Sequence, residues 1–384
     1  MNLDPTILLR SDRPSDVRER SLRLLRFMRY SVLCWFLALT FSFTSARPQN
    51  TLPAETYEDD GILKVLAIGN SFSEDAIENH LYDLAKEKNQ KIIIGNLYIG
   101  GASLDLHLEN ILKNHAAYEY RKTDVDGHKK NQLQTSVAQA LLDEDWDYIS
   151  VQQVSQLSGQ YDRIQPALKQ IIDYVKAHAR HPKLKIAYHQ TWAYAQTSTH
   201  DGFQHYNRDQ QTMYHAIMST TSQVRHLPYI DLVIPAGTAI QNARTSFVGD
   251  RLTRDGYHLS LGTGRYVAAC TWYEALFGTS AIGYLYKPAG MTQHEALMAQ
   301  HAAHEALKSP YQNTPLVNFF EELPTHSFNK PVNVAFGLHA QAEQSNTATG
   351  TQKEFGEFPV TITAGTTNNI GFEVLLPGRT SNYS

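Results

Sequence analysis

Short apolar runs alternate with longer stretches of helical spacing between residues 61 and 285. Apolar residues that recur every three or four positions predict amphipathic helices, whereas short uninterrupted apolar runs predict buried strands. The alternation of the two is typical of a parallel sheet with crossover helices. We therefore expect one doubly wound α/β domain over roughly residues 61–285.

The individual elements follow from the same patterns. Strands are expected at residues 63–68, 91–99, 148–151, 184–188 and, at one edge, 232–234. Helices are expected at residues 76–87, 137–142, 164–179, 206–224 and 264–277. A surface helix is expected at 292–307, and no cysteine or regular carboxylate pattern joins its histidines, so a solvated face is favoured over a metal site: His294, His301 and His304.

The N-terminal region has the parts of a secretory signal. Five arginines between residues 18 and 29 precede an apolar run at 30–43, and small residues follow up to Ala46. This order predicts a signal peptide over residues 1–46, cleaved after Ala46, with Met28 as an alternative start and a retained anchor as the competing interpretation. We expect a secreted or periplasmic protein with a linker at 47–60 and no stable membrane insertion after cleavage.

Residues 311–384 are expected to form a small β-rich segment with short strands at 332–336, 360–362 and 372–375. Cys34 lies inside the predicted signal, so the exported chain would keep Cys270 and form no internal disulfide. Lys and Arg number 34 against 38 Asp and Glu, and no basic block is interleaved with aromatic residues. This balance excludes nucleic acid as an expected partner.

Ser71 follows an apolar run that breaks at Gly69 and is followed by a helical pattern. In a parallel sheet ligands bind at the carboxyl ends of strands, and a following helix offers free N–H groups there. The pattern therefore predicts a nucleophile at a strand-to-helix corner. The alternative is structural, because Ser71 and Glu74 also have the spacing of a helix capping box.

Asp255 and His258 lie in a loop before the last helix of the domain. The spacing lets an aspartate carboxylate fold back onto the imidazole N–H, which fixes the tautomer and stabilises the imidazolium. A second glycine corner, at Gly100 and Gly101, directly follows the second expected strand. Glycine allows backbone N–H groups to approach a ligand closely, although a plain turn explains it equally well.

These blocks together resemble the SGNH or GDSL hydrolase superfamily. The resemblance implies a flavodoxin-like, three-layer α/β/α domain with a central parallel sheet over residues 61–310. The sequence Gly69-Asn70-Ser71 is similar to the first block, usually G-D-S, with asparagine at the second position. Gly101 matches the second block, and Asp255 with His258 match the closing D-x-x-H block. Within the superfamily, the I-G-N-S-F-S and R-D-G-x-H-L segments resemble the exported, DUF4886-like branch near the sialate-type acetylesterases.

The third block departs from the superfamily pattern. Where G-x-N-D is usual after the central strand, this chain has Gln152-Gln153-Val154-Ser155-Gln156. A glutamine amide donates a hydrogen bond as asparagine does. The resemblance implies an oxyanion hole made of the N–H groups of Ser71 and Gly101 and the amide of Gln152, with Gln153 and Gln156 as alternates.

The expected activity is hydrolysis of O-acyl esters, most simply O-acetyl groups on carbohydrates, by a Ser71–His258–Asp255 triad that needs no cofactor or metal. The partner is then a small-molecule or glycan ester. Trp192 and Tyr194 follow the fourth expected strand and are candidate sugar contacts, with core packing as the alternative. A lipid or thioester hydrolase with the same machinery and a catalytically silent glycan-binding protein are the competing functions.

Overall fold

A seven-stranded sheet organises residues 59–321, the part of the chain that the computed structural model describes. The predicted signal peptide, nearly all of the predicted linker and the strands expected beyond residue 331 lie outside these residues. The sheet has the order β4-β3-β2-β1-β5-β6-β7. Its five parallel strands are β1 (Ile62–Gly69), β2 (Lys91–Tyr98), β5 (Tyr148–Val151), β6 (Lys185–His189) and β7 (Leu232–Ile234).

The parallel strands confirm the expected architecture. Taken in chain order, they lie as second, first, third, fourth and fifth, which is the flavodoxin-like arrangement. The first strand, β1, pairs with β2 on one side and β5 on the other. The chain therefore changes direction across the sheet at β1, and such a switch point opens a crevice at the carboxyl ends of the strands.

An antiparallel hairpin that the sequence analysis did not predict extends the β2 edge. It consists of β3 (Tyr118–Thr123) and β4 (Lys129–Thr135). Only the last residue of β4 is buried, so this edge strand has no apolar alternation from which it could be recognised. Its lysines suit a sheet edge, because charged side chains oppose pairing with a further strand.

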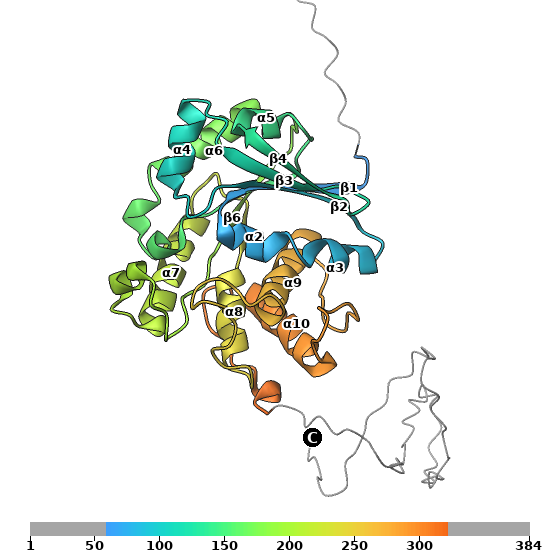
Figure 1. Ribbon diagram of the computed structural model, residues 1–384, viewed down its shortest axis with the longest axis vertical. Helices are drawn as coiled ribbons and strands as arrows, with labels where there is room; N and C mark the ends of the chain where they lie inside the picture. Colours follow the sequence, from blue (N-terminus) through green and yellow to red (C-terminus); the bar gives the residue numbers. More distant parts are fainter. Residues whose placement is uncertain (1–58, 322–384) are drawn as a thin grey trace, which may run out of the picture. The chain divides into compact units, whose positions relative to one another are not determined.

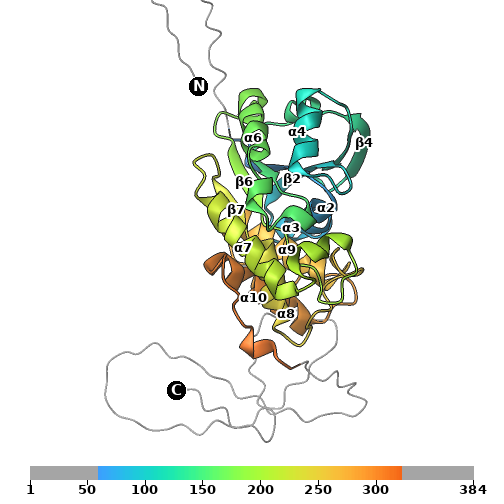
Figure 2. The same cartoon turned by 90° about the vertical axis from the view of Figure 1, so that its left-hand side faces the viewer.

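Helices cover both faces of the sheet (Figures 1 and 2). One face carries α4 (Leu104–Leu112), α5 (Val137–Leu141) and α6 (Ala167–His178). The opposite face carries α2 (Ser71–Ile77), α3 (Leu81–Glu87), α7 (Gln210–Arg225), α8 (Ala236–Arg244), α9 (Thr263–Phe277) and α10 (Gln293–Lys308). Each layer packs its own apolar cluster against the sheet, and the three-layer α/β/α fold is thereby confirmed.

Several helix boundaries differ from the expectation. The helix expected at 76–87 is two helices, α2 and α3, separated by residues 78–80. In this interval the Glu78 carboxylate accepts from the Asn96 amide on β2 at 2.5 Å and lies 3.5 Å from Arg121 on β3. The helix expected from residue 206 begins only at Gln210, after Asn207 with a φ of 56°. The helices α4 and α8 were not predicted.

The helix α10 was expected on the surface, and that is wrong for one of its faces. Its small residues pack against α8 and α9, and they include Ala299, Ala302 and Ala303. Small side chains allow neighbouring helices to approach closely, so an alanine-rich stripe marks a packed face. Within the described residues, no helix is long and apolar enough to span a membrane.

Candidate active site

The nucleophile candidate Ser71 lies where β1 passes into α2. Gly69 ends the strand, and a Cβ at this position would come within 2.4 Å of the Ser73 hydroxyl oxygen, so only glycine fits. Asn70 is the N-cap, with its side-chain oxygen accepting from the Phe72 N–H at 3.0 Å. Ser71 is therefore the first helical residue, and the capping-box alternative for it is wrong.

The structure brings Ser71, His258 and Asp255 into one hydrogen-bonded chain. The Nε2 atom of His258 is 2.8 Å from the Ser71 Oγ, and its Nδ1 atom is 2.6 Å from the Asp255 Oδ2. An ionised carboxylate can only accept, so Nδ1 carries the proton and Nε2 is left as an acceptor. The Ser71 hydroxyl then donates to Nε2, as a general-base arrangement requires.

Hydrogen bonds favour the ionised form of Asp255. Partial burial of this side chain opposes ionisation, but the His258 imidazole and the backbone N–H groups of His258 and Tyr257 donate to its oxygens. Together these donors lower the pKa of Asp255 below its ordinary value. Gly256 makes the tight turn possible, because its φ of 92° is unfavourable for any residue with a side chain.

A buried carboxylate that the sequence analysis missed holds this loop in place. Asp75 on α2 is fully buried, accepts from Arg254 at 2.9 Å, and lies 2.7 Å from the nearest nitrogen of Arg265. Its second oxygen accepts the backbone N–H of Leu259 at 2.7 Å. Arg254 and Leu259 flank the D-x-x-H block, yet nothing in the sequence indicated that their common partner lies four positions after Ser71.

Two backbone N–H groups on the pocket wall are available to an oxyanion. Among residues 59–321, the N–H groups of Ser71 and Gly101 donate to no protein acceptor. Gly101 has a φ of 67°, which turns the chain sharply after β2. The two glycine corners predicted from the sequence therefore lie side by side, since β1 and β2 are neighbouring parallel strands.

The three glutamines of the third block have different surroundings. The amide of Gln152, the first choice for the third donor, is buried and donates to the Asn70 side chain at 2.8 Å, and Gln152 itself is not among the residues that line the pocket. Gln153 accepts the first N–H of α4 at 3.0 Å and supports that helix. Gln156 lines the pocket, and its amide nitrogen donates to no other residue in the described part of the chain.

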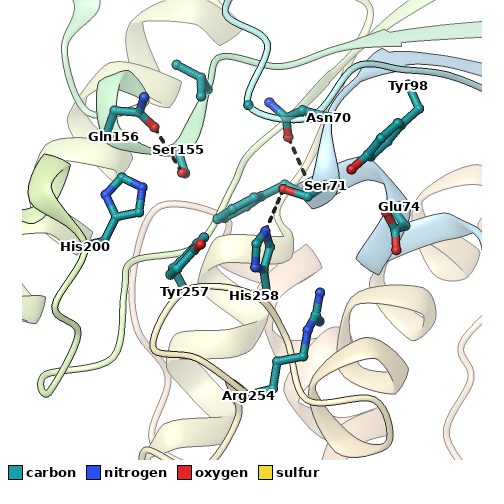
Figure 3. Close-up of a pocket in the computed structure, with 14 residues that line it drawn as sticks. Asn70, Ser71, Glu74, Tyr98, Ser155, Gln156, His200, Arg254, Tyr257 and His258 are labelled. Carbon is teal, nitrogen blue, oxygen red and sulfur yellow. Dashed lines mark hydrogen bonds between the residues drawn. The ribbon is translucent and has the colours of Figure 1, made fainter. Parts of the chain in front are cut away.

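The pocket has a volume of about 440 Å³ and is open to solvent. Figure 3 shows Ser71 and His258 at its centre, with Gln156, Ser155 and His200 on one side and Tyr98 and Glu74 on the other. The described residues that line it are mostly polar: Asn70, Ser71, Phe72, Glu74, Tyr98, Gly100, Gly101, Val154, Ser155, Gln156, His200, Arg254, Tyr257 and His258. Val154 is the only aliphatic side chain among them.

The surroundings of two pocket-wall side chains shift their pKa values. Partial burial and the nearby Glu74 carboxylate raise the pKa of the Tyr98 phenol, so its hydroxyl remains a hydrogen-bond donor. The Arg121 guanidinium covers the Tyr98 ring at 3.7 Å from its centroid. Burial also lowers the pKa of His200, which keeps that ring neutral near pH 7.

Trp192 and Tyr194, the predicted sugar contacts, are fully buried and do not line the pocket. Trp192 stacks on Phe72 at 4.3 Å and donates from its indole N–H to the Tyr257 carbonyl at 2.7 Å. The Tyr194 hydroxyl is 2.7 Å from the Ser155 Oγ. Both rings support residues of the pocket from behind, as the core-packing alternative described.

The histidines of α10 have partners other than a metal. His294 stacks on Phe247 with centroids 5.2 Å apart, and the Nδ1 atom of His304 is 3.0 Å from a Glu274 carboxylate oxygen. In the described range, no group of three or more His, Cys, Asp or Glu side chains has a spacing suited to a metal ion.

Comparison with known proteins gives one family match. The model of a domain of unknown function, DUF4886, matches residues 64–306, more than half of the chain. The crystal structure of a DUF4886 family protein from Bacteroides uniformis is 46% identical, with a TM-score of 0.66, and the similarity covers 67% of this chain and 99% of that one. No protein with a curated description matches the chain.

More distant solved structures are also similar in part. A candidate SGNH hydrolase from Slackia heliotrinireducens is 20% identical with a TM-score of 0.38, covering 56% of this chain and 98% of that one. TesA is 11% identical with a TM-score of 0.36, covering 56% and 97%. Likeness at this level identifies no activity. The family match and the similarity to the Bacteroides uniformis structure show that the chain belongs to the DUF4886 family.

Proposed function

We propose that this protein is a serine esterase of the SGNH type that hydrolyses small O-acyl esters, with O-acetyl groups on carbohydrates as its substrate class. The observation that carries the proposal is the hydrogen-bonded chain from Asp255 through His258 to Ser71 on the floor of an open pocket. A structural serine does not need a histidine acceptor oriented by a carboxylate. A nucleophilic serine does.

The proposed reaction follows from the roles of these atoms. The Ser71 Oγ attacks the ester carbonyl carbon while its proton passes to the His258 Nε2, and the carbonyl oxygen becomes an oxyanion. His258 then returns the proton to the leaving alcohol as the carbon–oxygen bond breaks, which leaves an acyl group on Ser71. Water, activated by the same imidazole, releases the acid and restores the serine.

The N–H groups of Ser71 and Gly101 are the backbone donors for the oxyanion in this proposal. Both lie on the pocket wall and donate to no acceptor within residues 59–321. The Gln156 amide is now favoured as the third donor over Gln152, because Gln156 lines the pocket whereas Gln152 donates to Asn70. Loss of one such donor typically lowers kcat by about 10² to 10³.

The composition of the pocket supports a small acyl group on a polar alcohol. A long acyl chain needs an extended apolar channel, and Val154 is the only aliphatic side chain among the described lining residues. Hydroxyl, amide, imidazole and carboxylate groups surround Ser71 instead, including Tyr98, Gln156 and Glu74. Groups of this kind hydrogen-bond the hydroxyls of a sugar. The predicted N-terminal signal sequence supports an exported location, where carbohydrate polymers are accessible.

The test is a hydrolysis assay on the purified chain and on Ser71→Ala. We expect the wild-type protein to release p-nitrophenol from p-nitrophenyl acetate and acetate from acetylated sugars, with much slower turnover of long-chain esters and thioesters. Ser71→Ala should lose nearly all turnover at an unchanged melting temperature. A variant that keeps more than a few per cent of the activity contradicts the assignment, and wild-type binding of polysaccharide without hydrolysis would favour a silent glycan-binding protein.

Two controls sharpen this assay. Exhaustive dialysis against EDTA should leave kcat unchanged, because the proposed steps use no Lewis acid, and a loss restored by zinc or calcium would contradict them. Gln156→Ala should lower kcat with little change in KM, since the bond to the oxyanion forms in the transition state. Gln153→Ala serves as the comparison variant, because Gln153 does not line the pocket and its side-chain oxygen accepts the first N–H of α4.

A further inference from the structure

Three buried polar side chains connect the Ser71 corner to the end of β6, and the proposed reaction uses none of them directly. Asn70, Gln152 and His189 are each about 1% exposed. The His189 Nδ1 is 2.6 Å from the Gln152 Oε1, and the Gln152 amide donates to the Asn70 Oδ1 at 2.8 Å. The Asn70 amide in turn donates to the Ala102 carbonyl at 2.9 Å.

Two backbone groups, the Phe72 N–H and the Ala102 carbonyl, determine which atom donates and which accepts in each of these hydrogen bonds. The Asn70 oxygen must be the atom that faces the Phe72 N–H, so the Asn70 nitrogen faces the Ala102 carbonyl. The Gln152 atom beside the Asn70 oxygen must then be the nitrogen, which leaves the Gln152 oxygen as an acceptor. The His189 Nδ1 can only donate to that oxygen, so His189 is the Nδ1–H tautomer.

This series of hydrogen bonds joins the two corners that carry the proposed oxyanion donors. Asn70 directly precedes Ser71, and Ala102 directly follows Gly101. The bond from Asn70 to Ala102 therefore bridges the corner after β1 to the corner after β2. Gln152 and His189 hold the Asn70 amide in the one orientation that makes this bridge, because reversing it would place oxygen against the Ala102 carbonyl.

We propose that Asn70, Gln152 and His189 form a neutral hydrogen-bond relay that sets the spacing of the Ser71 and Gly101 N–H groups, with His189 as a positioning residue for the oxyanion hole. This inference rests on the proposed function. It also gives one explanation for both departures from the SGNH pattern, Asn70 in the first block and Gln152 in the third. The aspartate usual at position 70 has no hydrogen to give the Ala102 carbonyl, and Gln152 supplies the donor that orients the asparagine.

Burial keeps the relay in one protonation state. The Nε2 atom of His189 is buried and has no hydrogen-bond partner within the described residues, and the ring meets Trp272 edge to face at 5.1 Å. A proton on Nε2 would create an unpaired charge there, and desolvation lowers the pKa of His189 to about 3. The relay is therefore uncharged throughout the pH range in which an esterase would work.

Two substitutions of His189 separate positioning from packing. In His189→Asn the side-chain amide nitrogen can occupy the place of Nδ1 and keep the donor, but the smaller side chain leaves a cavity. In His189→Leu the volume is better filled and the donor is lost. We expect His189→Leu to lower kcat by about 10-fold to 100-fold with little change in KM, as for other small displacements of reacting groups.

The ranking of the two variants by activity and by melting temperature distinguishes positioning from packing. Positioning predicts that His189→Asn is the more active but the less thermostable of the pair. If activity instead follows melting temperature, or if His189→Leu keeps the wild-type kcat, the relay has no positioning role. These outcomes are independent of Ser71→Ala, because a wild-type protein without esterase activity would contradict the proposed function alone.

A spectroscopic measurement tests the relay without any turnover. Long-range ¹H–¹⁵N correlation spectra of the wild-type chain, with His189 assigned by its loss in His189→Asn, should show the Nδ1–H tautomer. The signals should not shift between pH 8 and pH 5. An Nε2–H tautomer, or titration of this ring in that range, would overturn the relay.

Discussion

Ser71 and His258 are held by different kinds of backbone. Ser71 lies at the junction of β1 and α2, next to the buried polar side chains of Asn70 and Ser73. His258 lies in a segment, residues 250–262, that contains no helix or strand beyond an isolated bridge between Thr253 and Leu259. The first residue is positioned by regular structure, whereas the second depends on individual tertiary contacts.

The contacts on the loop reach back to the helix that carries Ser71. Asp75 on α2 bonds Arg254 and the Leu259 N–H on either side of His258. From behind, Trp192 donates to the Tyr257 carbonyl and stacks on Phe72 of the same helix. An irregular loop is thus fixed relative to Ser71, because both sets of contacts join the loop to α2, the helix that begins with Ser71.

The largest effect is expected when the proposed triad is broken. His258→Ala should remove nearly all turnover, and Asp255→Asn should lower kcat by about 10³ to 10⁴, because an amide no longer selects the Nδ1–H tautomer. Steady-state kinetics with p-nitrophenyl acetate measures both. A silent His258→Ala would mean that another group serves as the base.

The next largest effect is expected when the contact between α2 and the loop at residues 250–262 is removed. Asp75→Ala leaves Arg254 and Arg265 without their buried partner, and we expect a loss of about 3 to 5 kcal/mol in the free energy of unfolding. Activity should fall as well, because the loop loses its anchor. Urea denaturation gives the stability change, and Asp173→Asn, in an exposed pair with Lys169, is the matched control with a change below about 0.5 kcal/mol. Equal effects would show that Asp75 is no anchor.

A smaller effect is expected from the loop backbone alone. Gly256→Ala places a Cβ on a residue with a φ of 92° and within 3.0 Å of the Ser198 Cα, which should cost about 1 to 3 kcal/mol. Gly262→Ala is the matched control in the same segment, since its φ is −93° and no atom lies within 4 Å of the added Cβ. Thermal unfolding and kcat should both separate the two variants. Identical behaviour would mean that the loop tolerates displacement.

The smallest effect is expected in the pH dependence of stability, through the buried His189 side chain. Burial lowers the pKa of His189 to about 3, so below about pH 6.5 the unfolded chain binds a proton that the folded chain does not. Stability therefore falls as pH decreases from 6.5 toward 3, by at most about 1.4 kcal/mol per pH unit for this group. Unfolding free energies between pH 7.5 and 5.5 should decline less steeply in His189→Asn than in wild type. Parallel curves would contradict this.

The sequence predicted regular structure and short-range chemistry better than tertiary contacts. The strands at 148–151 and 232–234 match β5 and β7, because apolar runs bounded by turn residues identify buried parallel strands. The Asp255 and His258 side chains are hydrogen-bonded as their spacing predicted. The mostly exposed strand β4 had no apolar signal, and it was missed.

The remaining errors concern residues whose place depends on distant partners. Trp192 and Tyr194 looked like sugar contacts because aromatic rings near a strand end suit either a cleft or a core, and only packing decides between them. Gln152 was assigned to the oxyanion by its position after the strand, which does not show that Asn70 already takes its amide. Asp75 stabilises the site through residues nearly two hundred positions away, and local patterns carry no trace of that contact.

The distance along the chain between Ser71 and His258 has a consequence for folding. The hydrogen bond between them spans 187 residues, and β1, at the centre of the sheet, pairs with a strand more than eighty residues later. Closing such long loops is slow, so non-local contacts form late. In a refolding experiment, helical circular dichroism should therefore return before the proposed esterase activity, and a newly synthesised chain would lack that activity until the last helices of the described domain had docked.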